Sequence, residues 1–246
     1  MKIAFLSDIH GNAVALEAVL EDLEQNNADQ VVVLGDLCFR GPEPKRALKL
    51  VQQLDAKVIK GNVDEWTVRG VQQGEVPEAF VEVMNQEREW CLQELTDQDL
   101  DYLARLPEEV HLTLGEQLKI HGFHAVPDSL FDVVWPDSTP QKLEEALMKD
   151  KEAHIYVYGH IHLPFVRFLQ GKCVINTGSV GLPFDGLPLA SYVLVETDGP
   201  GYSVSIQRVP YDVERVVQLY QTKGYPNAEL MIRIVQEGKS PFEINK

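Results

Sequence analysis

Cysteine is scarce in this chain, with three residues, Cys38, Cys91 and Cys173, spread over 246 positions. An odd number of distant cysteines without a CxxC pair provides no disulfide framework. The first residues also lack a secretory signal, because Lys2 leads directly into a short strand-like segment with no cleavage site after it. We therefore expect a cytoplasmic protein in a reducing environment.

Basic residues are also few, since 22 Lys and Arg face 38 Asp and Glu, which leaves a formal net charge of −16. Such a surface repels nucleic acid and anionic membranes at long range. No apolar run is long enough to cross a bilayer. We expect neither a long nucleic acid nor a membrane as a partner, and an anionic substrate requires a local positive feature such as bound cations.

The first part of the chain alternates between apolar strand-like runs and segments with helical spacing. The runs at 2–7, 29–36 and 56–62 are predicted strands, and 13–25 and 44–54 are predicted helices. This strand–helix alternation predicts βαβ units and a parallel sheet. The sequence is therefore that of an α/β protein.

The remainder of the chain changes character twice. Residues 65–106 are rich in Glu, Gln and Leu, and predict a helical excursion that either caps a site or only packs on the flank. Closely spaced strands then predict antiparallel or mixed pairing, and two helices follow at about 211–238. No linker is evident, so we expect a single domain over residues 1–246. The later predicted strands are 108–114, 116–122, 154–160, 171–178, 191–196 and 202–209.

Polar side chains follow five of the predicted strands. In open α/β sheets, ligands gather outside the carboxyl ends of the strands. Carboxylates, imidazoles and an amide oxygen in one place are what a metal centre requires. The sequence therefore predicts a metal site at one sheet edge. The residues at these strand ends are Asp8 and His10, Asp36, Asn62, His121, and His160 with His162.

These motifs, in this order, resemble the calcineurin-like metallophosphoesterases from Asp8 to about Gly186. The blocks are D-x-H, G-D-x-x-x-R-G, G-N-x-D, a lone H-G, and G-H-x-H. The loop NTGSVGLPFDG is similar to one in a small bacterial branch of phosphodiesterases and diadenosine-tetraphosphatase relatives. The resemblance implies a four-layer α/β/β/α sandwich of two mixed β-sheets flanked by helices.

The resemblance also implies a site with two transition-metal ions, Mn, Fe or Zn. By this resemblance, the protein would be a phosphoesterase that hydrolyses phosphodiesters, phosphomonoesters or nucleotides by in-line attack of a metal-bridging hydroxide. Arg40 would contact the substrate phosphate, although a salt-bridged loop arginine is the alternative. One ion would be held by Asp8, His10 and His162, the other by Asn62, His121 and His160, and Asp36 would bridge them.

One position departs from the family pattern. The family often has His after the Asn of G-N-x-D, where it assists the leaving group, and this chain has Val63. Asp64 and His124 are the candidates to replace it, and Asp64 could instead orient a ligand histidine. We expect esters with acidic leaving groups, such as aryl esters or pyrophosphate linkages, to react well and alkyl esters to react slowly.

Several further features allow two interpretations. The backbone N–H groups of NTGSVGLP could bind an anion or only form a tight turn. Trp66, Phe123 and Trp135 could stack on a nucleobase or pack in the core, and packing is favoured. A non-catalytic metal-binding scaffold of the same fold is the alternative to an enzyme. The complete set of ligand positions favours a hydrolase.

Overall fold

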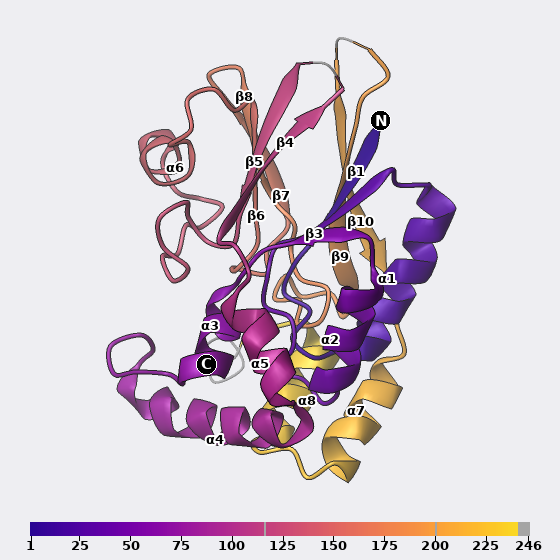
Figure 1. Ribbon diagram of the computed structural model, residues 1–246, viewed down its shortest axis with the longest axis vertical. Helices are drawn as coiled ribbons and strands as arrows, with labels where there is room; N and C mark the ends of the chain where they lie inside the picture. Colours follow the sequence, from indigo (N-terminus) through magenta and orange to yellow (C-terminus); the bar gives the residue numbers. More distant parts are fainter. Residues whose placement is uncertain (116, 200, 241–246) are drawn as a thin grey trace.

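The computed structural model describes residues 1–115, 117–199 and 201–240. Its first sheet has the strand order β10–β9–β1–β2–β3 (Figure 1). The strands β1, β2 and β3 are parallel, and β9 pairs antiparallel with both β1 and β10. This sheet is therefore mixed. Its strands are β1 (Lys2–Leu6), β2 (Gln30–Val33), β3 (Ala56–Val58), β9 (Ala190–Glu196) and β10 (Ser203–Val209).

The second sheet has the order β4–β5–β6–β8–β7. The central strands β5, β6 and β8 are parallel, whereas β4 and β7 pair antiparallel at the two edges. The mixed pairing predicted from the close strand spacing is confirmed. Its strands are β4 (Glu109–Leu114), β5 (Leu118–Phe123), β6 (Ile155–Tyr158), β7 (Phe165–Leu169) and β8 (Lys172–Asn176).

The two sheets pack face to face, as the alternating side chains of β1 show. Ile3 and Phe5 belong to the core between the sheets, together with Ile155 and Val157 of β6. Ala4 and its neighbours on the other face pack on the outer helices. Helices α1 (Ala13–Asn26) and α2 (Pro44–Gln53) cover the first sheet, and α6 (Pro140–Leu147) covers the second. The predicted four-layer α/β/β/α architecture is confirmed.

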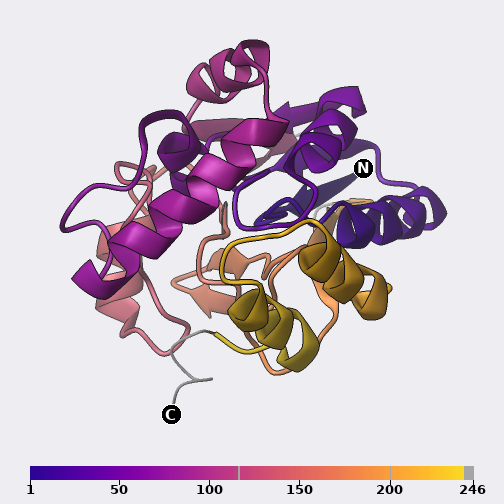
Figure 2. The ribbon, with the colours of Figure 1, turned by 90° about the horizontal axis from the view of Figure 1, so that it is seen from below.

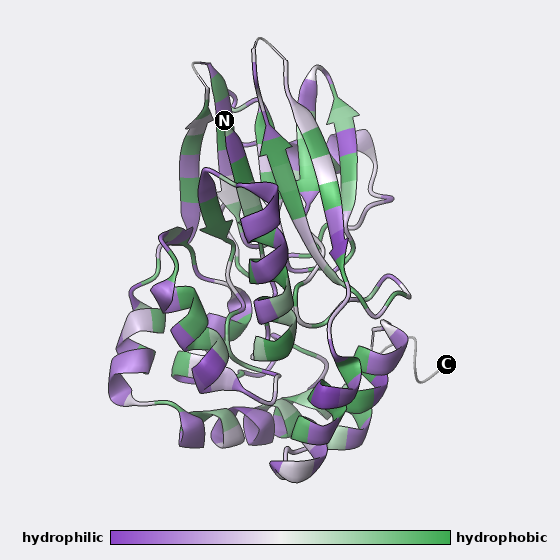
Figure 3. Cartoon of the chain, turned by 90° about the vertical axis from the view of Figure 1, so that its right-hand side faces the viewer, coloured by the Kyte–Doolittle hydropathy of each residue, from purple (hydrophilic) through white to green (hydrophobic). Residues whose placement is uncertain are grey.

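The other helices gather at one end of the sandwich. Figures 1 and 2 show them below the carboxyl ends of the parallel strands, where the polar strand-end residues lie. Apolar and polar positions alternate along these helices, as expected for helices with one buried face (Figure 3). The helices are α3 (Asn62–Arg69), α4 (Glu78–Glu94), α5 (Asp97–Ala104), α7 (Val213–Thr222) and α8 (Ala228–Glu237).

Two elements were not predicted from the sequence. Helix α6 begins with Thr139 as a cap and Pro140 in its first turn, a helix signal that was overlooked. Strand β7 is a half-exposed edge strand without a clear alternation. Glu116 of one predicted strand and residues 241–246 of the expected domain lie outside the described residues. Among the helices described, none is long and apolar enough to cross a membrane.

The core between the sheets should carry much of the stability. Ile120 of β5 is 1% exposed and packs there. We expect Ile120→Ala to lower the free energy of unfolding by about 2–5 kcal/mol, since it leaves a cavity between two sheets. Phe168→Ala, at a side chain that is 67% exposed, should change it by less than about 0.5 kcal/mol. Urea denaturation of both variants measures the difference, and equal losses would contradict this placement of the core.

Candidate metal centre

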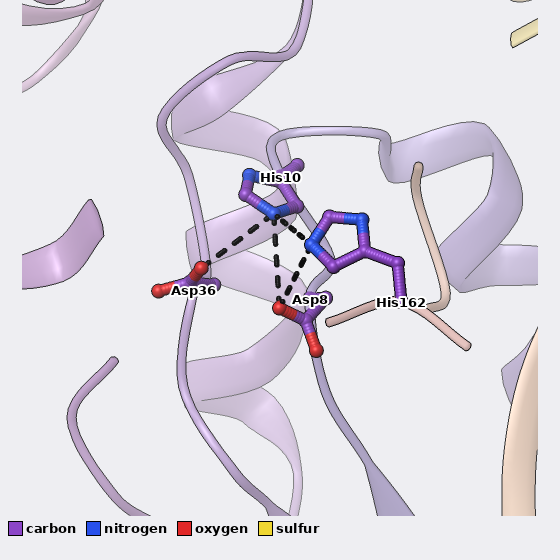
Figure 4. A group of neighbouring side chains, drawn as sticks. All are labelled: Asp8, His10, Asp36 and His162. Carbon is purple, nitrogen blue, oxygen red and sulfur yellow. Dashed lines mark hydrogen bonds and ion pairs between the residues drawn. The ribbon is translucent and has the colours of Figure 1, made fainter. Parts of the chain in front are cut away.

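Four strand-end side chains converge below the sandwich. Asp8 follows β1, Asp36 follows β2, and His162 follows β6. With His10 they form a buried group whose ligand atoms all lie within 4.8 Å of one another. Figure 4 shows the two carboxylates and two imidazoles pointing toward a common centre. The edge predicted from the sequence therefore brings these four residues together.

The histidines of this group present lone pairs to one another. His10 Nδ1 lies 3.0 Å from the carbonyl oxygen of Phe39, and His162 Nδ1 lies 2.5 Å from that of Leu182. A carbonyl only accepts, so each Nδ1 donates and each Nε2 is left with a lone pair. The two Nε2 atoms are 3.2 Å apart. Burial lowers the pKa of His10 to about 4, so this imidazole is neutral at pH 7 and cannot bridge the pair with a proton.

Asp8 adds an acceptor at the same point. Its Oδ1 lies 3.1 Å from His162 Nε2 and is buried without a hydrogen-bond partner. Its Oδ2 accepts from the Ser7 hydroxyl and from the His160 backbone N–H. Burial opposes the ionisation of Asp8, but its surroundings lower its pKa overall. An ionised oxygen and two imidazole lone pairs around one space fit a divalent cation, which needs several such donors.

A second group adjoins the first through Asp36. Asn62 Oδ1 lies 2.8 Å from His124 Nε2 and 2.9 Å from His160 Nδ1, and Asp36 Oδ2 lies 3.4 Å from His124 Nε2. Burial lowers the pKa of His124, but attraction by Asp36 and Asp8 outweighs it and raises the pKa to about 9. A positive charge is thus favoured where these oxygens meet. A cation fits this place as well, and Asp36 faces both groups.

The prediction that His121 joins this site is wrong. Its side chain points to the outer face of the second sheet, where Nε2 lies 2.8 Å from Glu109 Oε2 and the ring stacks on His111. His124, three residues later, faces the site and donates from Nδ1 to the Leu34 carbonyl. Positions three apart along extended chain point to opposite faces, so only one of the two histidines can face the site. His121, His111 and Glu109 form a separate, partly exposed cluster.

The side chain of Asp64 is also not placed as a catalytic acid would need to be. It is fully buried, and its two oxygens accept from the backbone N–H groups of Asp36, Leu37 and Gly61. Burial, followed by repulsion from Asp36, raises the pKa of Asp64 to about 7. It therefore holds the loop that carries Asp36 against the start of α3. His124 Nε2 faces Asn62 and Asp36, an arrangement that does not favour the leaving-group role, which stays a prediction.

The backbone of the site is strained. Among the described residues, six of the nine non-glycine positions with positive φ are Asp8, His10, Asp36, Arg40, His160 and His162. Each such conformation costs of order 1–3 kcal/mol and persists only where the surroundings enforce it. Glycines allow the close approach this needs: a Cβ on Gly61 would lie 2.1 Å from Asp36 Oδ1, and one on Gly159 would lie 2.5 Å from Asp8 Oδ2. The ligand atoms are therefore positioned before any cation arrives.

Backbone from the 176–186 loop helps to enforce this geometry. Val180 N–H donates to the Ser7 carbonyl and Gly181 N–H to the Asp8 carbonyl. These N–H groups are already bound within the protein, so they do not provide the anion-binding nest considered from the sequence. Phe123 packs in the outer core of the second sheet, as favoured. Cys38 is fully buried.

A cavity of about 360 Å³ opens from the centre, and Arg40 lies in its wall. Arg40 Nε donates to Glu87 Oε2 at 3.2 Å, and Nη2 contacts the Met231 sulfur. Burial alone would lower the pKa of Arg40, but Glu87 raises it overall, so the guanidinium stays charged.

Glu87 is fully buried on α4, on the same face as Met84 and Cys91. Glu87 was not predicted as a site residue, although a charge on the apolar face of a helix is a signal that the sequence carries. Helix α4 therefore lines the cavity, as expected if the helical excursion caps the site.

Carboxylate and imidazole acceptors that converge at the floor of a cavity are the kind of ligand set that a catalytic metal site requires. Comparison with known families matches residues 1–199 to the calcineurin-like phosphoesterase superfamily domain, so the chain belongs to this superfamily of metal-dependent phosphoesterases. It is 29% identical over 207 residues to the phosphodiesterase YfcE of Escherichia coli K12, which covers 80% of this chain and 89% of YfcE.

Two solved structures share the whole architecture. A metallophosphoesterase from Sphaerobacter thermophilus superposes with a TM-score of 0.76 at 25% identity, covering 97% of this chain and 99% of that one. The protein PH1004 of Pyrococcus horikoshii superposes with a TM-score of 0.83 at 22% identity, with the same coverage. These likenesses extend to the helices beyond residue 199.

The placement of the two histidines of β5 yields a direct test. We expect His124→Ala to lose about one bound cation per chain, because it removes a donor beside Asn62 and Asp36. His121→Ala should bind as many cations at the strand ends as the parent protein. Elemental analysis after loading with Mn²⁺ and gel filtration measures the stoichiometry, and circular dichroism checks folding. Loss of a cation in His121→Ala but not in His124→Ala would restore the original assignment.

Proposed function

We propose that the protein is a dinuclear metal-dependent phosphoesterase that acts on small phosphoesters. The observation that carries this is the convergence of buried acceptor atoms, with Asp36 shared between two groups, at the floor of a cavity that also contains Arg40. One cation would be held by Asp8, His10 and His162, the other by Asn62, His124 and His160, and Asp36 would contact both.

A bound pair of divalent cations supplies Lewis acidity, which lowers the pKa of water and neutralises charge on phosphate. The chain's own residues prepare the site for this. The Phe39 and Leu182 carbonyls fix the tautomers of His10 and His162 so that Nε2 faces inward. Asp64 holds the backbone of Asp36, whose Oδ1 also accepts from Val63 N–H at 2.9 Å. Little reorganisation then accompanies substrate binding.

Arg40 is the phosphate-binding residue in this proposal. Its guanidinium is planar and can donate parallel hydrogen bonds to two phosphate oxygens. Glu87 and Met231 hold it in the cavity wall, and its carbonyl accepts from the Tyr220 hydroxyl. The sequence allowed an ion-paired arginine as the alternative to a phosphate-binding one. In this proposal Arg40 is both, because its ion pair with Glu87 orients the guanidinium for phosphate.

Val63 bears on which leaving groups the site can accept. It lines the cavity at the position where the family often has histidine. Valine donates no proton, and Asp64 and His124 are both occupied elsewhere. General acid assistance is worth about 10²–10⁴-fold, so esters whose leaving groups need protonation are expected to react slowly. We propose that aryl esters and other esters with acidic leaving groups are the better substrates.

The donor set of carboxylates, imidazoles and one amide suits Mn, Fe or Zn. Cys38, Cys91 and Cys173 are free and buried, which supports our proposal of a reducing, cytoplasmic setting.

Hydrolysis of bis(p-nitrophenyl) phosphate by the Mn²⁺-loaded protein tests this function. We expect Arg40→Ala to lower kcat/KM by about 10- to 100-fold, since charged hydrogen bonds to phosphate are lost. Arg40→Lys should recover little of it, because an ammonium cannot donate a parallel pair. Asp36→Asn should lose more than either variant. Absence of turnover with Mn²⁺, Fe²⁺ and Zn²⁺ alike would reject the proposal.

The missing leaving-group acid can be restored. We expect Val63→His to raise the ratio of alkyl to aryl phosphodiester turnover by about tenfold or more, because the imidazole protonates the poorer leaving group. Val63→Leu is the control of similar size without a proton to give. Rates for p-nitrophenyl and alkyl esters, measured at pH 7 with the same metal loading, provide the ratio. An unchanged ratio in a folded, metal-loaded Val63→His protein would count against this explanation.

A further inference from the structure

The cavity above the metal centre has two chemically different ends. The polar end consists of metal-centre residues and Arg40, whereas the remaining wall is largely apolar. This wall comes from α3, α4, α8 and the loops after β5, β6 and β8, which are far apart in the sequence but meet below the sheets (Figure 2). Five of its residues are aromatic. They are Trp66, Phe80, Phe131, Trp135 and Phe184.

Charges in the described wall are already neutralised in pairs. Glu87 is bound to Arg40, and Glu75 is bound to Arg69 and to the indole N–H of Trp66. Arg40 is the one Lys or Arg among the described lining residues, so a second phosphate group would find no further basic side chain in this wall. Because unpaired charge is costly to place against apolar surface, the cavity disfavours polyphosphates and other groups with additional charge.

The aromatic residues are held in place rather than loosely exposed. Trp66 and Phe131 have ring centroids 5.7 Å apart, and the Arg69 guanidinium lies 5.6 Å from the centre of the Phe131 ring. Phe184 stacks on the ligand histidine His162 at 4.2 Å. Trp135, in contrast, is 48% exposed, which is large for an aromatic residue that lines a cavity. Its ring is left available for an additional apolar group.

We propose that this wall binds an uncharged aromatic ester group of a substrate with a single phosphate. The inference rests on the proposed function, which places that phosphate at the metal centre and Arg40. A volume of about 360 Å³ is sufficient for a small aromatic ester, and falls in the range of small-molecule sites. The aromatic group lies against Trp135 and Trp66 while the phosphate is held at the polar end. Trp135 is then a specificity-determining residue.

Phosphonates test this without hydrolysis, because each carries one organic group on a stable C–P bond. Isothermal titration calorimetry of the Mn²⁺-loaded protein should show benzylphosphonate binding at least about tenfold more tightly than methylphosphonate. 2-Carboxyethylphosphonate should bind more weakly than propylphosphonate, which has a similar size but no second charge. Equal affinities within either pair, or no binding by any phosphonate, would overturn the inference.

Variants locate the preference. Trp135→Ala should bring the benzyl-to-methyl affinity ratio close to one, and Trp135→Phe should retain most of it. Phe168→Ala removes an even more exposed aromatic residue on β7, which is not a lining residue, and should leave the ratio unchanged. A full ratio in Trp135→Ala would refute the proposed role of this residue. Phosphonate binding in the expected order without hydrolysis of any phosphoester would instead reject the proposed function and leave the binding inference standing.

Discussion

The rest of this structure depends on one constraint. Several buried acceptor atoms face one another, and no hydrogen-bond donor lies between them. The Nε2 atoms of His10 and His162 and the Oδ1 atom of Asp8 share one space, and each would be costly to bury there without a partner. A cation removes this cost. The carbonyls behind the imidazoles, the strained backbone at the strand ends and the buried Asp64 all act to keep the acceptors together in its absence.

The same constraint accounts for how an acidic protein can act on an anion. The chain has a formal net charge of −16, and Arg40 is the one Lys or Arg among the described residues that line the cavity. Under the proposed function, attraction for phosphate is therefore concentrated at the cations and one guanidinium, and the rest of the cavity contributes apolar contact. In such a site the phosphate determines where the substrate reacts, and the apolar wall determines which substrate is accepted.

Much of the fold and part of the site could be read from local patterns. Continuous apolar runs identified nine of the strands that the structure describes, and strand ends marked by Asp, Asn and His identified the edge where the site lies. Asp8, His10, Asp36 and His162 meet as expected because the carboxyl ends of β1 and β2 in one sheet and of β6 in the other reach the same end of the sandwich. Such signals are local, and they are carried by residue type and spacing within a few positions.

What the sequence by itself determined was therefore most of the strands, the edge and the chemistry of the donors, while the sandwich followed from its resemblance to the calcineurin-like metallophosphoesterases. Only the tertiary structure decided between His121 and His124, since the side of β5 that faces the other sheet depends on how β5 packs, and neighbouring positions cannot reveal it. Only packing, likewise, brought Glu87 to Arg40, 47 positions away, and assembled an aromatic wall from helices and loops. Contacts between distant segments depend on the geometry of the whole fold, which no local pattern contains.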